Sequence, residues 1–417
     1  MPYPQNNFQN VQTYQNAMLL ALQNEMPVVA NANKKFDNFQ NLVANLGTTV
    51  LYKKPGRVTT SASLVWDIQG INQRTQSLTV DQPVSSAVEI TDPQALFNMD
   101  VADFMKDFGD DIVTKIGAQM ETYASLDFIK HPYRFYGDPN QPISTFKDLA
   151  RAVTMFKNYG SAKRECFGFI PDMSKDNIIN SGQNQFTPER NNENAQSWEL
   201  GSFSQTKWMT SSLLQSHLAG SEGQAGTTLT VVSTTKDASG NITAITFSGC
   251  SAASDADSVK QYDRFYSTDA TNFMLQFSNY QKSANPIQFQ ASADAASNGS
   301  SRVTVTLKVP LYPGQSVTDS VAINNDIVAG MTFKVVDSHT AGCIYSGDPH
   351  MFASPMMGSQ DPFASWSETD PKTGMGISFA AGAFLGQGKQ AVGGYGIYGS
   401  TFTPEYGMTL LFPYNPS

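Results

Sequence analysis

One stripe of apolar residues constrains the fold of this chain more than any other feature of its sequence. Between residues 101 and 123 the apolar positions recur at steps of three and four, the period of a helix with one dry face. Aspartates crowd the start of this stretch, where the helix dipole favours anions. The pattern predicts a helix from about 100 to 130, about 45 Å long at ~1.5 Å per residue. The stripe consists of Val101, Phe104, Met105, Phe108, Ile112, Ile116, Met120 and Tyr123.

The segment before this helix, residues 47–91, alternates in the manner of β-strands. Leu64, Trp66 and Ile68 alternate with polar residues, and the same period of two returns around residues 78–80 and 88–90. Turn residues at Gly70–Gln73 separate the first two runs. We predict a long protruding hairpin, with a sheet edge packed on its own domain as the alternative. Its rim carries four basic residues: Lys53, Lys54, Arg57 and Arg74.

Shorter patterns flank these two elements. Residues 1–46 are polar apart from one amphipathic stretch at Met18–Leu22, and predict a helical arm that cannot fold alone. After the long helix, residues 144–159 predict a second amphipathic helix, and Cys166–Ile170 predicts a buried strand. The pattern of residues 174–198 predicts a helix followed by a loop, and residues 199–220 contain an apolar run around Trp208.

From about 221 to 345 the composition shifts to Thr, Ser, Ala, Val and Gly, with turn signals between short runs of β-formers. This pattern predicts an all-β module inside an α+β chain. Residues 346–417 return to mixed structure and end in strands at Gln390–Tyr398 and Tyr406–Phe412. The strands expected in the module are Leu229–Val232, Ile242–Phe247, Phe273–Phe277, Val303–Val309 and Met331–Val336.

Composition limits the partners of the chain. The net charge is −9, and the 27 basic residues are scattered along the sequence rather than gathered into one strip. A protein that grips nucleic acid through its phosphates needs such a strip, so we expect at most a wall around DNA. Charged residues make up only 15% of the 417 residues. A surface with so few charges repels copies of itself weakly, which suits self-association.

The ends and cysteines of the chain bear on its location. The three cysteines, Cys166, Cys250 and Cys343, form no pair with metal or disulfide spacing. The first residues lack the basic and apolar regions of a signal peptide, and no apolar stretch has the length of a membrane span. We therefore expect a chain that is made in a reducing cytoplasm and has no membrane partner.

Catalytic and cofactor motifs are not recognisable in the sequence. The four histidines have no partners at catalytic or ligand spacing, and Asp348-Pro349-His350 is better explained as a loop than as a metal site. The run Gly382–Lys389 has five residues where a phosphate-binding loop has four, and Gln390 follows instead of Ser or Thr. We expect no enzyme activity, no cofactor and no metal.

The order of these elements resembles the major capsid proteins of tailed phages, with the Hong Kong-type capsid fold. It is most similar to the coat proteins of short-tailed phages of enteric bacteria, which carry an inserted β domain. Arg74–Phe104 resembles the second hairpin strand running into the spine helix, and Asp103–Leu126 resembles the spine helix itself. Three further stretches are similar to helix, strand and return segments of the axial domain: Ser144–Asp172, Glu199–Gly220 and Asp361–Phe384.

The resemblance implies an α+β capsid fold with an inserted all-β domain. It also implies a structural subunit that assembles with its own copies into hexamers and pentamers of an icosahedral shell around double-stranded DNA. Scaffolding and portal proteins would be partners, and the chain would assemble in the host cytoplasm and reside in the virion capsid. The implied parts are an N-terminal arm (1–46), an extended-loop hairpin (47–91), a peripheral domain with the spine helix (92–143), an axial domain (144–225 and 346–417) and the inserted domain (226–345).

The hairpin is the expected contact between subunits, because its apolar face is not expected to be buried within one subunit. The proposed interface residues are Lys53, Lys54, Arg57, Leu64, Trp66, Ile68 and Arg74. One alternative is another virion component, such as a tail, decoration or adhesin protein, which the Thr- and Ser-rich module favours. A second is a hydrolase or sugar-binding enzyme that uses Trp198, Trp208, Tyr262 and Tyr266, although no paired carboxylates accompany these rings.

Overall fold

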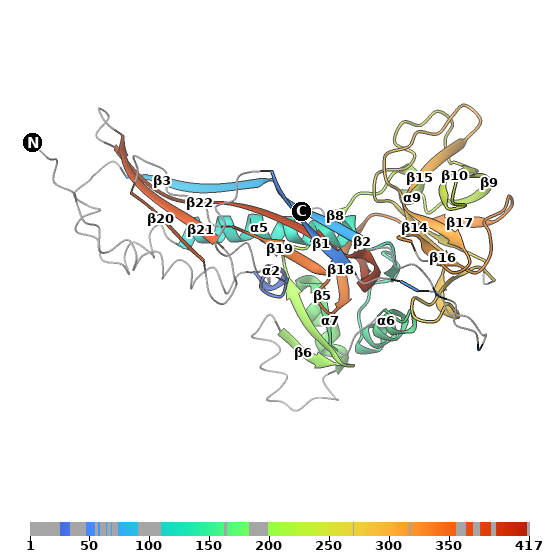
Figure 1. Cartoon of the computed structure of the whole chain (residues 1–417), viewed down its shortest axis with the longest axis horizontal. Helices are drawn as coiled ribbons and strands as arrows, with labels where there is room; N and C mark the ends of the chain where they lie inside the picture. The colour runs from blue at the N-terminus through green and yellow to red at the C-terminus, as the bar shows by residue number, and fades with distance from the viewer. Residues whose placement is uncertain are drawn as a thin grey trace, which may run out of the picture. The chain divides into compact units, whose positions relative to one another are not determined.

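The structure is a computed structural model of an α+β chain in which strands outnumber helices among the described residues (Figure 1). The chain divides into two compact units. The first contains residues 1–51, 77–125 and 350–401, and the second contains 52–76, 126–349 and 402–417. The described residues are 26–33, 47–54, 57–58, 64, 68, 74–90, 110–161, 165–182, 199–269, 271–316, 318–355, 364–369, 376–384 and 389–414.

The first unit is built on a sheet of long antiparallel strands. Strand β22 (Lys389–Phe402) lies between β21 (Gly376–Phe384) and β3 (Gln82–Ile90), and β21 pairs with β20 (Ala364–Thr369). The short strand β19 (His350–Ala353) also joins this sheet. The β3 ladder runs from Gln82 opposite Tyr398 to Ile90 opposite Gln390.

Helix α5 (Asp110–Lys130) confirms the predicted helix over its described part. Residues 100–109 lie outside the described part of the chain. The apolar stripe of α5 is buried at Ile112, Ile116, Met120 and Ala124, which follow one another at intervals of one helical turn. Figure 1 shows the helix running beside β3 and β22, and the rings of Tyr123 and Tyr398 meet edge-on at 5.2 Å. Twenty-one residues give the helix a length of about 32 Å.

The described start of the chain is fixed to this helix. The buried carboxylate of Glu121 accepts hydrogen bonds from the backbone N–H groups of Val28 at 2.9 Å and Val29 at 3.0 Å, in the short helix α2 (Pro27–Ala30). Asn33 then pairs with β19, where its N–H donates to the carbonyl of His350 at 2.8 Å. The N-terminal arm predicted over residues 1–46 is otherwise outside the described residues.

The hairpin predicted over 47–91 differs from the structure in its extent. Strands β1 (Thr48–Lys54) and β2 (Arg74–Val80) form a two-stranded sheet, and the connection between them spans 55–73. The predicted turn at Gly70–Gln73 lies outside the described residues. Residues 82–90, however, form β3 and pair with β22 in another sheet. Leu64 and Ile68 lie outside any strand, so the strand expected at 64–68 is wrong at both of its described ends.

The second unit contains a seven-stranded mixed sheet, which includes the strands directly before and directly after the β-rich module. Its central strand β18 (His339–Ser346) pairs with β5, β8 and β23, and every residue of β18 is buried. A strand buried on both faces has no polar alternation, which is why the sequence did not reveal it. Its other strands are β4 (Phe135–Tyr136), β23 (Gly407–Pro413), β5 (Cys166–Pro171), β7 (Thr206–Ser211), β6 (Glu199–Phe203) and β8 (Ser216–His217).

Two helices accompany this sheet. Helix α6 (Phe146–Asn158) begins at Thr145, whose hydroxyl oxygen accepts a hydrogen bond from the Asp148 N–H at 3.2 Å. This is the N-cap expected where an amphipathic stretch follows a threonine. The apolar face of α6 joins the core with Trp208, which is fully buried. Helix α7 (Asp172–Gly182) confirms the helical half of the prediction for 174–198, and residues 183–198 are outside the described part.

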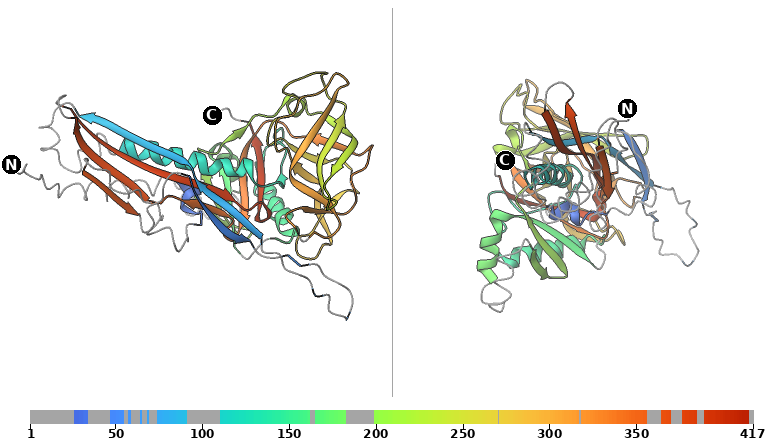
Figure 2. Two further views of the ribbon diagram at one scale, coloured as in Figure 1. Left: turned by 45° about the horizontal axis from the view of Figure 1, so that its top comes forward. Right: turned by 90° about the vertical axis from the view of Figure 1, so that its left-hand side faces the viewer.

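The β-rich module forms a nine-stranded sheet whose strands wrap around a common interior (Figure 2). Four phenylalanines, Phe247, Phe265, Phe289 and Phe333, occupy its core, and the rings of Phe265 and Phe289 stack at 4.9 Å. Its elements are α9 (Ser221–Gln224), β9 (Thr228–Lys236), β10 (Ile242–Ser248), β11 (Arg264–Ser267), β12 (Phe273–Leu275), β13 (Lys282–Pro286), β14 (Gln288–Gln290), β15 (Arg302–Pro313), β16 (Val321–Ile323) and β17 (Thr332–Val335).

All five strands predicted for the module are confirmed, and the predicted end of the module, residue 345, lies within β18. The chain leaves the main sheet at β8 and returns to it at β18, where His217 and His339 are paired directly. Residues 339–345, assigned to the inserted domain from the sequence, therefore belong to the main sheet. Adjacent points of departure and return are typical of an inserted domain.

Candidate subunit interface

The residues predicted to contact neighbouring subunits lie on and between β1 and β2. Lys53 and Lys54 end β1, and Arg74 begins β2. Arg57, Leu64 and Ile68 lie in the connection, and Trp66 falls outside the described residues. Of the six described residues of this set, the three cations Lys54, Arg57 and Arg74 pack within the chain. The cation Lys53 and the aliphatic residues Leu64 and Ile68 are exposed.

Lys54, Arg57 and Arg74 converge on two carboxylates. Arg74 forms ion pairs with both Asp319 and Glu405, and its Nε donates to Asp319 at 2.8 Å. The Arg57 Nη2 lies 3.1 Å from Glu405, and the Lys54 Nζ lies 3.6 Å from Asp319. We call these five residues the root cluster, because they join the two ends of the 55–73 connection to the rest of the second unit.

Further contacts fix Arg57 within the root cluster. Its Nη1 donates to the carbonyl of Thr318 at 2.9 Å and to that of Ser320 at 3.1 Å. Its guanidinium also lies 4.5 Å from the ring centroid of Phe277, which adds a cation–π contact. Sequence reasoning identified these cations but not their partners, because Asp319 and Glu405 are far away in the chain.

Burial and charge act against each other in this cluster. Burial disfavours the charge on Arg74, but Glu405 and Asp319 more than offset this effect, so the pKa of Arg74 lies above its usual value. Partial burial likewise opposes the charge on Asp319, but the hydrogen bond from Arg74 and the nearby Lys54 hold its pKa below the usual range. Arg74 and Asp319 are therefore both charged at neutral pH.

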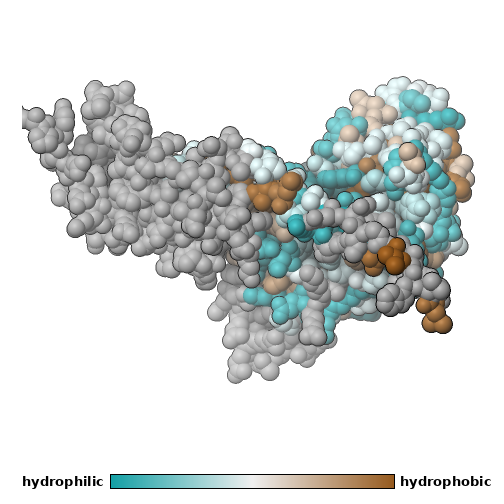
Figure 3. Space-filling model, viewed as in Figure 1, coloured by the Kyte–Doolittle hydropathy of each residue, from teal (hydrophilic) through white to brown (hydrophobic). Residues whose placement is uncertain are grey.

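The aliphatic side chains of the connection have the opposite environment. Leu64 is fully exposed, Ile68 is 89% exposed and Val58 is 53% exposed. Large exposed aliphatic side chains are ordinary when they are scattered singly, but here three fall within eleven residues. Elsewhere the visible face of the molecule is mostly hydrophilic or neutral where it is described, with a few apolar patches (Figure 3).

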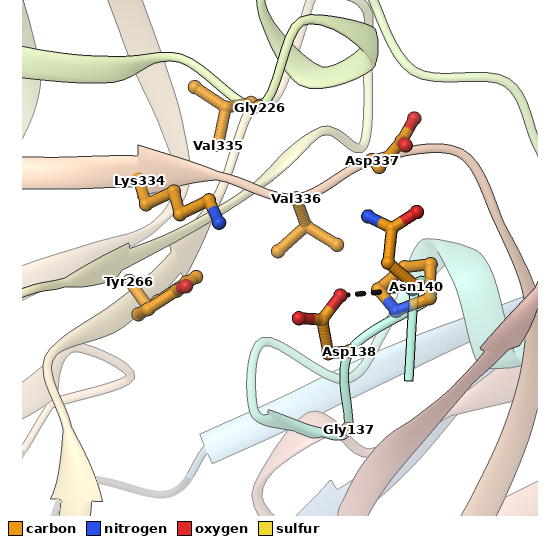
Figure 4. Close-up of a pocket in the computed structure, with 10 residues that line it drawn as sticks. Gly137, Asp138, Asn140, Gly226, Tyr266, Lys334, Val335, Val336 and Asp337 are labelled. Carbon is orange, nitrogen blue, oxygen red and sulfur yellow. Dashed lines mark hydrogen bonds between the residues drawn. The ribbon is translucent and has the colours of Figure 1, made fainter. Parts of the chain in front are cut away.

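One hollow of the second unit is too small for a ligand site. This hollow, shown in Figure 4, lies between the turn at Gly137–Asn140 and the end of β17, and has a volume of about 40 Å³. Two carboxylates line it, and each accepts a backbone hydrogen bond: Asp138 from the Asn140 N–H at 3.0 Å and Asp337 from the Ser338 N–H at 2.6 Å. Such a volume holds a water molecule or two rather than a substrate.

A larger groove of about 480 Å³ lies beside the start of α7. Serines, prolines and apolar residues line most of it, with Asp172 as its one carboxylate. Among the described residues, no group of three or more His, Cys, Asp and Glu side chains is placed to hold a metal ion. No described helix is long and apolar enough to cross a membrane.

Comparisons with known proteins find similarity to solved structures but none to sequences. No protein-family model and no curated protein matches the sequence. A chain of Mycobacterium phage Che8 is similar over 92% of this chain and 90% of its own, with a TM-score of 0.42 and 7% identity. The capsid of Ralstonia phage GP4 is similar over 91% and 87%, with a TM-score of 0.42 and 9% identity. The capsid of cyanophage P-SCSP1u is similar over 92% and 89%, with a TM-score of 0.36 and 8% identity.

Proposed function

We propose that this chain is the major shell subunit of a tailed-phage capsid and has a structural rather than a catalytic role. The observation that carries the proposal is the connection between β1 and β2. Its ends are fixed to its own subunit by the root cluster, while Val58, Leu64 and Ile68 are exposed within it. A segment with a fixed base and uncovered aliphatic residues is suited to contacting another copy.

The arrangement of elements supports the same proposal. The sequence resemblance to tailed-phage coat proteins consists of a hairpin, a spine helix and an axial domain interrupted by a β-rich domain. The β1–β2 hairpin, the 21-residue helix α5, the mixed sheet and the nine-stranded module follow in that order. In such a shell, head-to-tail contacts between copies would close into five- and six-membered rings.

Several finer features belong to this proposal. The subunits form hexamers and pentamers of an icosahedral shell that encloses double-stranded DNA without reading its sequence, in keeping with the net charge of −9. Scaffolding and portal proteins take part in assembly, which takes place in the host cytoplasm. In this proposal the inserted domain extends from near residue 226 to the residues before β18, because β8 and β18 are paired in the mixed sheet. Kinship with the short-tailed enteric phages remains a prediction from the sequence.

Expression of the full chain with a candidate scaffolding protein tests the proposal. Sedimentation and negative-stain microscopy should show closed particles or tubular heads tens of nanometres across. A folded monomer or small oligomer in the presence of the scaffold would contradict it. Open fibres, or rings that do not assemble into closed particles, would instead favour a tail or decoration component. The β-rich module supports that alternative.

A further inference from the structure

The C-terminal end of α5 has an unusual set of partners. The last carbonyls of a helix have no partner within the helix and must find one elsewhere. At the end of α5 the carbonyls of Phe128, Ile129 and Lys130 accept hydrogen bonds from side chains far away in the sequence. Most of these side chains belong to the β-rich module, and all of them lie in the second unit together with residues 126–130.

Arg264, the first residue of β11, is central to these contacts. Its Nη2 donates to the carbonyls of Phe128 at 3.2 Å and Ile129 at 3.0 Å, and its Nη1 donates to that of Pro132 at 2.7 Å. The side chain is fully buried, and among the described residues no carboxylate lies within salt-bridge distance of it. Burial lowers the pKa of Arg264 to about 9, so the guanidinium is charged at neutral pH. The negative end of the helix dipole favours a cation at this position.

Two glutamines of the adjacent strand β14 continue the same contact. Gln290 Nε2 donates to the carbonyl of Ile129 at 2.6 Å. Gln288 binds both backbone groups of Phe135: its Oε1 accepts from the N–H at 3.1 Å, and its Nε2 donates to the carbonyl at 3.0 Å. A side-chain amide that pairs in both directions replaces the two hydrogen bonds of a neighbouring strand. Lys308 of β15 adds a hydrogen bond to the carbonyl of Lys130.

We propose that Arg264, Gln288 and Gln290 form a clamp that holds residues 128–135 on the β-rich module, so that the end of α5 and this edge of the module open and close as one unit. The clamp binds backbone atoms, so it fixes the path of the chain rather than the identity of its side chains. The contacts that define it occur within one subunit, and the proposal stands whether or not the chain forms a shell.

Amide hydrogen exchange of the full-length chain tests the clamp, because exchange reports the local opening of each segment. In the unaltered protein, residues 127–136 should exchange with the same protection as β11 and β14. The double variant Gln288→Ala/Gln290→Ala should raise the exchange rate of residues 127–136 by about tenfold, because each lost hydrogen bond contributes modestly to closing. Strands β9 and β10, at the other side of the module, should keep their rates.

Gln261→Ala is the matched control, since Gln261 also lies in the module but donates to the carbonyl of Ser292 at 2.8 Å. It should leave residues 127–136 unchanged. Arg264→Met should raise the exchange rate of residues 127–136 more than the glutamine double variant does. If Arg264→Met does not fold, the glutamine double variant alone tests the clamp. The clamp is refuted if residues 127–136 stay within about twofold of the unaltered rate, if Gln261→Ala has the same effect, or if β9 and β10 accelerate equally.

Discussion

At the scale of single residues, two buried charged side chains of this chain, Glu121 and Arg264, hold backbone groups far away in the sequence. Glu121 accepts two N–H groups of α2, and Arg264 donates to two carbonyls in the last turn of α5 and to that of Pro132 just after it. A buried charge without partners is costly, so each of these residues is tied to one particular path of the backbone. Their sequence neighbourhoods give no sign of this role, because each partner is more than 90 residues away in the chain.

Glu121→Gln should lower the free energy of unfolding by about 2 kcal/mol. Glutamine has one acceptor oxygen where the carboxylate has two, so its amide group would face the N–H of either Val28 or Val29. Urea unfolding of the full chain measures the change. Gln119→Ala, an exposed position on the same helix, serves as the control and should remain within about 0.5 kcal/mol. Equal unfolding midpoints for the two variants would contradict the role of Glu121.

His339 should make the stability depend on pH. Burial, together with Arg264 and His217, holds the pKa of His339 well below its usual 6.5. Below pH 6.5 the unfolded chain therefore binds a proton that the folded chain excludes, and stability falls as the pH drops toward the folded pKa. The expected slope from this one group approaches about 1.4 kcal/mol per pH unit.

His339→Asn tests that expectation by urea unfolding between pH 7.5 and 5. Asparagine has no titrating group, and its amide can still donate to the carbonyl of Asp337, which lies 2.8 Å from the histidine Nδ1. The variant should lose part of the decline in stability at acidic pH. Parallel stability curves for the two proteins would show that His339 does not cause the decline.

At the scale of elements, the root cluster shows which carboxylate matters most. Glu405 is 3% exposed and contacts both Arg57 and Arg74, whereas Asp319 is 57% exposed. Removing one partner of a buried ion pair leaves an uncompensated charge, while an exposed pair contributes little. The two carboxylates bind the same arginine, so they form a natural comparison.

Glu405→Gln should destabilise the chain by about 3 kcal/mol, and Asp319→Asn by less than about 1 kcal/mol. Denaturant unfolding of both variants measures the two values. Limited proteolysis should then cut residues 55–73 faster in Glu405→Gln than in the unaltered chain, because the connection has lost its anchor. The assignment fails if Asp319→Asn has the larger effect.

The elements predicted from the sequence are those with a regular pattern along the chain. Helices α5 and α6 each bury one apolar stripe, and buried and exposed residues alternate along strands β10 and β15. A short stretch of sequence is therefore enough to predict these elements. Strand β18 is buried on both faces, and β11, β13, β14 and β16 are short, so their apolar residues showed no period. The root cations were found but were expected to face a neighbour, because their carboxylates lie about 245 to 350 residues further along the chain.

At the scale of the whole molecule, the low charge of the chain and its exposed aliphatic residues favour the same behaviour. With 15% charged residues, copies of the chain have little electrostatic resistance to close contact. Leu64 is fully exposed and Ile68 is 89% exposed in the single subunit. Burying one such side chain against a neighbour contributes about 1.5–3 kcal/mol before the costs of association. Contacts of this size are individually reversible, yet they hold a shell when repeated at every subunit.

The double variant Leu64→Asp/Ile68→Asp should therefore abolish particle formation with the scaffold while the free subunit stays folded. Both side chains are solvated in one subunit, so their replacement should leave the unfolding midpoint unchanged, but two carboxylates could not enter an apolar contact without loss of solvation. Sedimentation reports the particles and circular dichroism the fold. Met173→Asp, at another exposed apolar position, is the control and should still form particles. Particles at full yield from the double variant would show that the connection is not part of the interface. An unfolded subunit would show instead that both residues belong to a hydrophobic core.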